Sequence, residues 1–311
     1  MVKTKQIILL CLGLVFLLSA ANVTATEEIW QTDFAAAKAK AQKENKLLLI
    51  DFTGSDWCGW CKKLKKEVFS QKLFQQKAAQ EFVLVELDFP QKTKLDEKLT
   101  TQNKGLAKAY SISGYPSIVL TDAAGVEFAR TGYKPGGAQA YLDHLQGFVK
   151  NYQQAQIFEQ EATKLDGIEK AKKLDQAIAL LVANGSKRSY DDLSDEIIAL
   201  DKDGKAGLRP KYELPKKISA IESQLKQDKD FDKAVAELDK LAPQASNVPS
   251  LQQQIYLFQA GILIKGKGDK TKGLERLQLA QKAAPDTQTG QQLIEFIDRM
   301  QQEGEAGVSK Q

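Results

Sequence analysis

Two continuous apolar runs constrain the fold of this chain more than any other feature. They are LLLIDFT at residues 47–53 and FVLVELDF at residues 82–89. Each run has the length of a strand, and neither alternates polar with apolar residues, which is the pattern of a strand buried on both faces. Such strands need helices on both sides, so we predict a central sheet between two layers of helices.

The segments around these runs predict the other elements of an α/β domain. Helices are expected at residues 33–44, from the cysteines at 58 and 61 through residue 69, at 104–110 and at about 137–150. Further strands are expected after Tyr115-Pro116 and at 126–131, and residues 90–105 are expected to form a polar insertion. Because the alternating helices and strands end in a hairpin, the predicted sheet is mixed.

The second half of the chain has a different composition and predicts helices only. From about residue 155 it is rich in Lys, Gln, Ala and Leu, with apolar residues three and four positions apart. One segment, GDKTKGLERLQLAQKAAPD, resembles the second helix of a tetratricopeptide repeat, although the full pattern of that family is missing. The predicted domains are a mixed-sheet domain at 26–150, a linker at 151–157 and an all-α, helical-repeat domain at 158–311.

The first 25 residues have the features of a signal peptide. Lys3 and Lys5 precede the apolar run 7–18, and the small residues at 23–25 fit a cleavage site. The run is shorter than the roughly 20 residues that a membrane-spanning helix needs. An uncleaved N-terminal anchor is the alternative. We therefore expect an exported protein, either periplasmic or secreted.

Charge and cysteine content exclude several classes of protein. The net charge of +4 is close to balance, which gives no argument for binding nucleic acid or a membrane surface. Cys11 lies in the expected signal peptide, so Cys58 and Cys61 remain. A structural zinc site needs four Cys or His ligands, and the single histidine, His144, reads as an ordinary helix residue. Unless a second chain supplies ligands, we expect no metal, and no other cofactor.

The spacing WCGWC therefore favours redox chemistry. A structural disulfide that closes so short a loop would stabilise the chain little. Cys58 stands at the expected start of a helix, where unpaired backbone N–H groups and the helix dipole favour a thiolate. Cys58 could then attack a client disulfide, and Cys61 could resolve the mixed disulfide. The lysines at 62, 63, 65 and 66 either add positive potential or form a solvated helix face.

Three motifs in this order resemble the thioredoxin family, over roughly residues 28–150. IDFTGSDWCGWCKKL is similar to the family's active-site region, and SGYPSIVL to its second landmark, a cis-proline. The resemblance implies that Tyr115-Pro116 is a cis peptide packed against the disulfide and that Tyr115 offers backbone to an extended client. Gly132 matches a glycine beside the substrate groove. The implied architecture is an α/β thioredoxin-like fold followed by an all-α domain.

The resemblance also implies a role for Asp51, which interrupts the first apolar run. In this family an aspartate behind the cysteines relays a proton during resolution, and burial raises the pKa of such a carboxyl group. Here one extra residue separates Asp51 from Cys58, and Leu84 or Glu86 replaces the family's lysine on the next strand. Asp51 either relays a proton through different neighbours or caps the end of the strand.

The residues around the cysteines bear on the direction of the reaction. Reduction potentials in this fold run from about −270 mV for thioredoxin to about −120 mV for DsbA. Gly59 and Trp60 between the cysteines add no charge that would stabilise a thiolate, which favours a reductase, while Trp57 matches the family and should pack beside the site. Trp60 could instead contact unfolded clients, as in an isomerase. The insertion and the expected export resemble periplasmic thioredoxin-like reductases of the DsbH kind.

The expected partners follow from this chemistry. They are client proteins with disulfides and a membrane thiol-transfer protein that resets the redox state. The alternative is that the helical domain is the main functional part, a scaffold that binds a partner protein next to a redox-regulatory domain. Deletion of residues 155–311 would separate these hypotheses.

Overall fold

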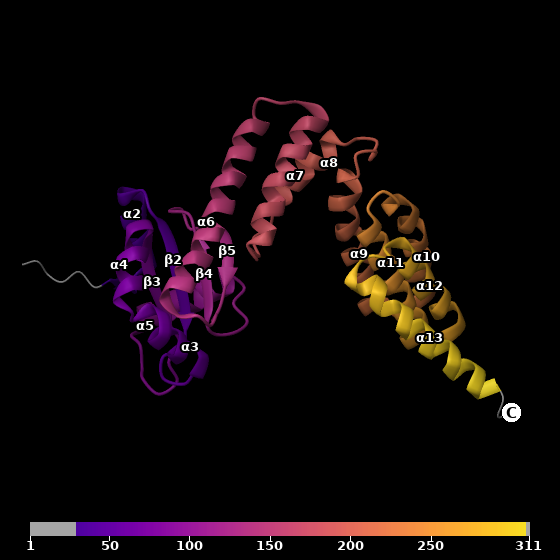
Figure 1. Ribbon diagram of the computed structural model, residues 1–311, viewed down its shortest axis with the longest axis horizontal. Helices are drawn as coiled ribbons and strands as arrows, with labels where there is room; N and C mark the ends of the chain where they lie inside the picture. Colours follow the sequence, from indigo (N-terminus) through magenta and orange to yellow (C-terminus); the bar gives the residue numbers. More distant parts are fainter. Residues whose placement is uncertain (1–28, 309–311) are drawn as a thin grey trace, which may run out of the picture. The chain divides into compact units, whose positions relative to one another are not determined.

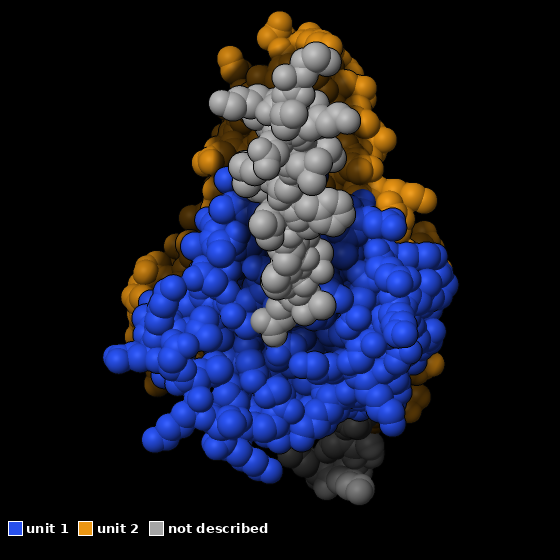
Figure 2. Space-filling model, turned by 90° about the vertical axis from the view of Figure 1, so that its left-hand side faces the viewer, with its two compact units in different colours: residues 1–125, 132–142 blue, residues 126–131, 143–311 orange. Residues whose placement is uncertain are grey.

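The computed structural model describes residues 29–308, with side chains as far as Gln302. The expected signal peptide lies outside the described residues. The chain forms two compact units (Figure 2). The first comprises the residues up to Gly125 together with Gly132–Leu142, and the second comprises Val126–Thr131 and the residues from Asp143 onward.

The described residues contain one five-stranded mixed sheet, as predicted, in the order β1-β3-β2-β4-β5 (Figure 1). β3 lies parallel to both β1 and β2, whereas β2 and β4 are antiparallel. The strands are β1 (Trp30–Gln31), β2 (Leu47–Thr53), β3 (Phe82–Asp88), β4 (Ser117–Thr121) and β5 (Glu127–Thr131).

One face of β2 and β3 packs against α2 (Phe34–Glu44) and α5 (Glu97–Ala109). Because side chains alternate along a strand, every second residue of β2 and β3 points to this face. The buried cluster is Phe34, Ala37, Ala41, Leu48, Ile50, Phe52, Val83, Val85, Leu87 and Val119. Leu106 and Tyr110, at the end of α5, are partly buried against it.

The intervening residues of β2, among them Asp51, point to the opposite face. This face carries a buried aromatic cluster in which the ring of Phe69 lies 5.0 Å from that of Phe74 and 5.8 Å from that of Tyr141. The elements that contribute to this side are α3 (Gly59–Leu64), a π-helical turn η1 (Lys65–Phe69), α4 (Lys72–Glu81) and the first residues of α6 (Gly137–Ala162). Burial on both faces explains why the two apolar runs lack alternation.

The structure differs from the sequence-based expectations in four places. β1 and α4 were not predicted, and α5 begins at Glu97, inside the expected polar insertion, because the Asp96 carboxylate accepts the N–H of Leu99 at 2.8 Å and caps the helix. Residues 151–157, expected as a linker, are helical within α6 because the segment holds no proline or glycine and buries Ala155. The expected domain limits stay a prediction.

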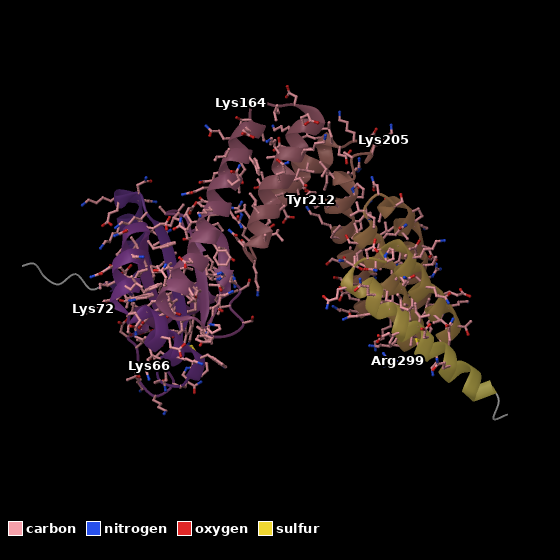
Figure 3. All side chains as sticks on the ribbon, in the orientation of Figure 1. Lys66, Lys72, Lys164, Lys205, Tyr212 and Arg299 are labelled. Atoms are coloured by element: carbon pink, nitrogen blue, oxygen red, sulfur yellow. A yellow bond between two sulfur atoms is a disulfide. The ribbon has the colours of Figure 1, made fainter. Side chains whose placement is uncertain are left out.

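The second unit is largely helical, as predicted. Its further helices are α7 (Gly167–Ala183), α8 (Asp191–Leu200), α9 (Leu208–Asp228), α10 (Phe231–Leu241), α11 (Pro249–Gly261), α12 (Lys270–Ala283) and α13 (Gln288–Val308). Tyr212 of α9, labelled in Figure 3, donates its hydroxyl to Asp175 of α7 at 2.6 Å. No helix in the part of the chain that is described is long and apolar enough to cross a membrane. The helical-repeat architecture remains a prediction.

The outer strand β5 is held by the segment after α7. The N–H of Arg130 donates to the carbonyl oxygen of Asn184 at 2.9 Å, and the N–H of Lys187 donates to the Glu127 carboxylate at 2.9 Å. Glu127 and Arg130 form a buried ion pair with 2.6 Å between their atoms. Gly185 has φ +71°, and a Cβ there would lie 3.1 Å from the carbonyl oxygen of Arg130. Both the backbone conformation and the close contact therefore favour glycine at this position.

Candidate active site

Cys58 and Cys61 form a disulfide at the start of α3, with an S–S distance of 2.10 Å. Cys58 is the N-cap residue of this helix and has extended backbone angles. Its Sγ accepts the N–H of Cys61 at 3.1 Å, so the sulfur already occupies the position at which a helix start stabilises negative charge. The two residues are 6% and 4% exposed. Gly59, between them, is the first residue of the helix.

Trp57 directly precedes Cys58 and packs against Phe89 and Tyr115. Its indole N–H donates to the carbonyl oxygen of Phe89 at 2.8 Å, and its ring meets that of Tyr115 edge-on at 5.6 Å. The rings of Phe89 and Tyr115 lie 5.2 Å apart. A Cβ on Gly54 would lie 2.5 Å from the Trp57 ring, so only glycine leaves room for the indole. Trp57 is nevertheless 38% exposed and can be reached by a client.

Trp60 lies on the surface next to a second aromatic residue. It is 57% exposed, and its ring lies 5.0 Å from that of Tyr133. The Lys63 ammonium lies 5.2 Å from the Trp60 ring and 5.0 Å from the Tyr133 ring, in cation–π geometry. The Tyr133 hydroxyl donates to Glu67 at 2.8 Å. The Lys63 ammonium therefore contacts both rings and also lies 4.0 Å from the Glu67 carboxylate.

The expected cis peptide is present at Tyr115-Pro116. Gly132 lies beside it, because a Cβ on Gly132 would be only 3.2 Å from the carbonyl oxygen of Pro116. The buried hydroxyl of Tyr141 donates to the Gly132 carbonyl oxygen at 2.9 Å and so holds the backbone directly after β5. The structure thus places Pro116 and Gly132 side by side, and the roles of Tyr115, Pro116 and Gly132 in client binding stay a prediction.

Asp51 is buried, at 4% exposure, and its Oδ1 has no hydrogen-bond partner among the described residues. Burial, and next the nearby charge of Glu86, raise the pKa of its carboxyl group well above the usual range. Asp51 lies opposite Glu86 in the β2–β3 register, and β2 continues two residues beyond it. The carboxyl group is therefore inside the strand and not at its end.

A lysine from another element faces this pair of carboxyl groups. Lys65 of η1 donates to Glu86 at 2.9 Å, and its charge lowers the pKa of Asp51 against the effect of burial. The positive charge that acts on Asp51 thus comes from the helical segment after the cysteines. The rest of the lysine run is divided: Lys62 donates to the Asp56 carbonyl oxygen at 2.8 Å, and Lys66 is exposed (Figure 3).

Asp56, just before Trp57, was not singled out from the sequence. Its carboxylate accepts the N–H groups of Gln91, Lys92 and Thr93 at 2.7–3.1 Å, and these hydrogen bonds lower its pKa to about 2. The active-site loop and the insertion are thereby tied together. No local pattern reveals such a contact between residues 35 positions apart. Tyr133 was also missed, although its place next to Gly132 was a usable signal.

Among residues 29–302, whose side chains the structure describes, no group of three or more His, Cys, Asp or Glu side chains could hold a metal ion. His144 lies in α6, where its Nε2 is 3.0 Å from the Thr131 hydroxyl and its ring is 4.4 Å from that of Phe148. Its contacts are those of a packing residue.

Comparison with known proteins agrees with this geometry. A family model described as a thioredoxin-like domain matches residues 34–146. The fold and the Cys58–Cys61 pair define the class: the chain belongs to the thioredoxin-like family and is a thiol–disulfide oxidoreductase. Within the class it is DsbH-like, since it is 34% identical over 128 residues to the disulfide bond reductase DsbH of Chlamydia pneumoniae, covering 41% of this chain and 76% of that protein.

The chain is also similar to a second Dsb protein and to a solved DsbH structure. The thioredoxin-related protein DsbJ of Chlamydia pneumoniae is 31% identical over 130 residues, which are 42% of this chain and 37% of DsbJ. A solved structure of a DsbH oxidoreductase is 35% identical, with a TM-score of 0.38, and the match covers 39% of this chain and 83% of that one. All three similarities leave more than half of this chain without a counterpart.

Proposed function

We propose that this protein reduces disulfides in exported client proteins, with Cys58 as the nucleophile and Cys61 as the resolving cysteine. The observation that carries the assignment of roles is the position of Cys58 at the N-cap of α3, where its sulfur accepts the N–H of Cys61. A thiolate at this sulfur is stabilised by that N–H and by the helix dipole, whereas Cys61 lies one turn inside the helix.

In the first step the Cys58 thiolate attacks one sulfur of a client disulfide. A bond forms between Cys58 Sγ and that sulfur, the client S–S bond breaks, and the other client sulfur leaves as a thiolate. In the second step Cys61 Sγ attacks Cys58 Sγ, which forms the intramolecular disulfide and releases the second client thiolate. Two electrons pass from the protein dithiol to the client, and no cofactor takes part.

Asp51 is proposed to accept the proton of Cys61 in the second step. Burial raises the pKa of its carboxyl group, which favours uptake of a proton, and its Oδ1 is not engaged by another described residue. Lys65 and Glu86 are proposed as positioning residues, because their charges set the protonation of Asp51.

The side chains around the disulfide are proposed to bind an extended client. Trp57, Trp60 and Tyr115 offer apolar surface, Gly132 leaves room beside Pro116, and Gly59 adds no side chain. The reductive direction is supported by the printed name of the DsbH relative and by the absence of charge in the Gly59-Trp60 dipeptide. Export to the periplasm, and resetting by a membrane thiol-transfer protein, belong to the same proposal.

The reduction potential of the Cys58–Cys61 pair tests the direction. The protein comprising residues 26–311 is equilibrated with dithiol or glutathione buffers, and free thiols are quantified by alkylation. We expect a value near that of thioredoxin, about −270 mV. A value near that of DsbA, about −120 mV, would reverse the proposed direction and leave the roles of the two cysteines unchanged.

A further inference from the structure

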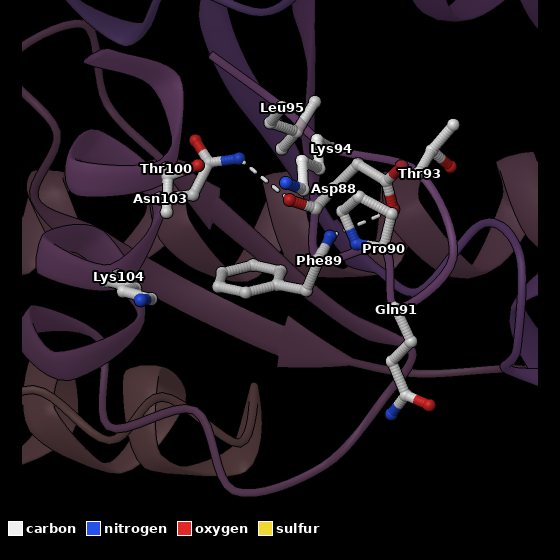
Figure 4. Close-up of a pocket in the computed structure, with 10 residues that line it drawn as sticks. All are labelled: Asp88, Phe89, Pro90, Gln91, Thr93, Lys94, Leu95, Thr100, Asn103 and Lys104. Carbon is white, nitrogen blue, oxygen red and sulfur yellow. Dashed lines mark hydrogen bonds between the residues drawn. The ribbon is translucent and has the colours of Figure 1, made fainter. Parts of the chain in front are cut away.

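A cavity of about 360 Å³ lies between the end of β3, the segment at residues 90–95 and α5 (Figure 4). Three of its lining residues, Phe89, Pro90 and Leu95, are apolar. Thr100 and Asn103 face it from successive turns of α5. The cavity is formed largely by the insertion, to which the proposed function assigns no role.

The cavity is adjacent to the active site. Phe89 lines it. The carbonyl oxygen of Phe89 accepts the indole N–H of Trp57, and its ring lies 5.2 Å from the Tyr115 ring. Trp57 directly precedes Cys58. A client segment that lies over Trp57 can therefore reach the cavity with a side chain a few residues from its cysteine, since an extended chain spans about 3.3 Å per residue.

The cavity walls are held in place by hydrogen bonds. Asp56 binds three successive backbone N–H groups of the insertion, and Asp96 caps α5. On the other wall the Asn103 amide donates to the Asp88 carbonyl oxygen at 2.9 Å, as the dashed line in Figure 4 shows. A cavity with fixed walls can bind a ligand without the cost of ordering them.

The rim of the cavity is positively charged. Lys94 and Lys104 line it, both are exposed, and neither forms an ion pair with a described residue. The Asp88 carboxylate, the acidic group among the lining residues, is engaged by the N–H and hydroxyl of Ser55 and by the N–H of Phe89. Two cationic groups are therefore left to face an incoming ligand.

We propose that this cavity is a client-binding subsite that takes an apolar side chain flanked by a carboxylate. The apolar side chain packs against Phe89 and Leu95, and the carboxylate pairs with Lys94 and Lys104. The proposal rests on the proposed function, because it names the class of client on which the cysteines act: acidic segments with an apolar residue near the cysteine.

The test compares three disulfides as substrates of the reduced protein. They are a peptide disulfide with leucine and two glutamates beside the cysteine, the same peptide with glutamine in place of glutamate, and hydroxyethyl disulfide. Rate constants are measured by acid quench and mass spectrometry. We expect the wild type to prefer the glutamate peptide over the glutamine peptide by about fivefold at low salt, and the preference should vanish at about 1 M salt, where screening acts over about 3 Å.

Two pairs of variants connect the preference to the cavity. Thr100→Trp fills it, and Thr101→Trp, on the next residue of α5 and exposed, is the control. Thr100→Trp should lower the ratio of the peptide rate to the hydroxyethyl disulfide rate about tenfold. A loss of this size is expected when one apolar client side chain can no longer be buried in the cavity.

The second pair of variants tests the charge of the rim. The double variant Lys94→Gln with Lys104→Gln removes both positive charges at the cavity. Its control is Lys72→Gln with Lys108→Gln, which removes the same net charge from exposed positions outside the cavity. The double variant at the cavity should abolish the preference for the glutamate peptide, and the control should keep it.

The outcomes separate the two proposals. Equal effects of Thr100→Trp and Thr101→Trp, or of the two double variants, would overturn the subsite while the disulfide chemistry stands. A reduced wild-type protein that acts on none of the three disulfides would overturn the proposed function, and the subsite with it.

Discussion

Replacing Asp51 by asparagine should stabilise the oxidised protein, and the gain should grow with pH. The carboxyl group is buried, and its Oδ1 has no partner among the described residues. A buried polar group without a partner costs about 1–3 kcal/mol, and more when it is charged. Asparagine has nearly the same shape and carries no charge, so the variant avoids the part of this cost that comes from burying a charge.

The pH dependence follows from the raised pKa of Asp51. Below the ordinary pKa of 3.8 the group is protonated in both the folded and the unfolded protein, and no penalty for burying a charge arises. As the pH rises from there through the folded pKa, the unfolded chain releases its proton first. The wild type loses stability over this window relative to the variant, which does not titrate.

Urea unfolding followed by tryptophan fluorescence measures this difference. The three tryptophans, at positions 30, 57 and 60, all belong to the first unit, so the signal reports on the unit that holds Asp51. With a urea slope of about 2 kcal/mol per M, a gain of about 2 kcal/mol raises the midpoint by on the order of 1 M at pH 8. At pH 3 the two midpoints should nearly coincide.

Asp88→Asn is the matched control on the neighbouring strand. Its carboxylate accepts two N–H groups and the Ser55 hydroxyl, so the same substitution should lower the midpoint at pH 8. A midpoint of Asp51→Asn that is equal to or below that of the wild type at pH 8, or a gain independent of pH, would refute the reasoning.

Three further predictions concern the chemistry and the insertion. Cys61→Ser should still attack a client disulfide but accumulate the mixed disulfide, seen as a shifted band on a non-reducing gel. Lys65→Met removes a charge that lowers the pKa of Asp51, so the pH profile of mixed-disulfide resolution should move to higher pH, while Lys66→Met leaves it in place. Asp56→Asn should speed hydrogen exchange at the amides of residues 91–93. Because the pKa of Asp56 is lowered to about 2 from 3.8, this effect should be complete above pH 4 and shrink as the pH falls toward 2.

The central strands were predictable because burial leaves a clear pattern. The run at 47–53 coincides with β2, and the run at 82–89 with β3 to within one residue. The two-residue strand β1 was missed because so short a segment carries no periodicity; its pairing with β3 defines it. The early start of α5 rests on the Asp96 cap, within a stretch whose polar composition is equally typical of a loop.

The site was predictable where residues are close in sequence and less so where they are not. The cysteine pair and its helix start follow from local order, and the cis peptide from its motif. The contact of Lys65 with Glu86 bridges 21 positions, and that of Trp57 with Phe89 bridges 32. Such pairs depend on how β2, β3 and the helices pack, which no window of sequence records.

The hydrogen bond between Arg130 and Asn184 has a practical consequence for protein engineering. A gene fragment that stops near residue 155, or even at the end of α6, would leave the outer backbone of β5 bare and separate Glu127 from Lys187. An uncovered strand edge invites pairing with other chains, so such a fragment should aggregate in the test tube. The shortest fragment that contains the cysteines and keeps β5 covered therefore extends past residue 187. This is some forty residues beyond the last position matched by the family model.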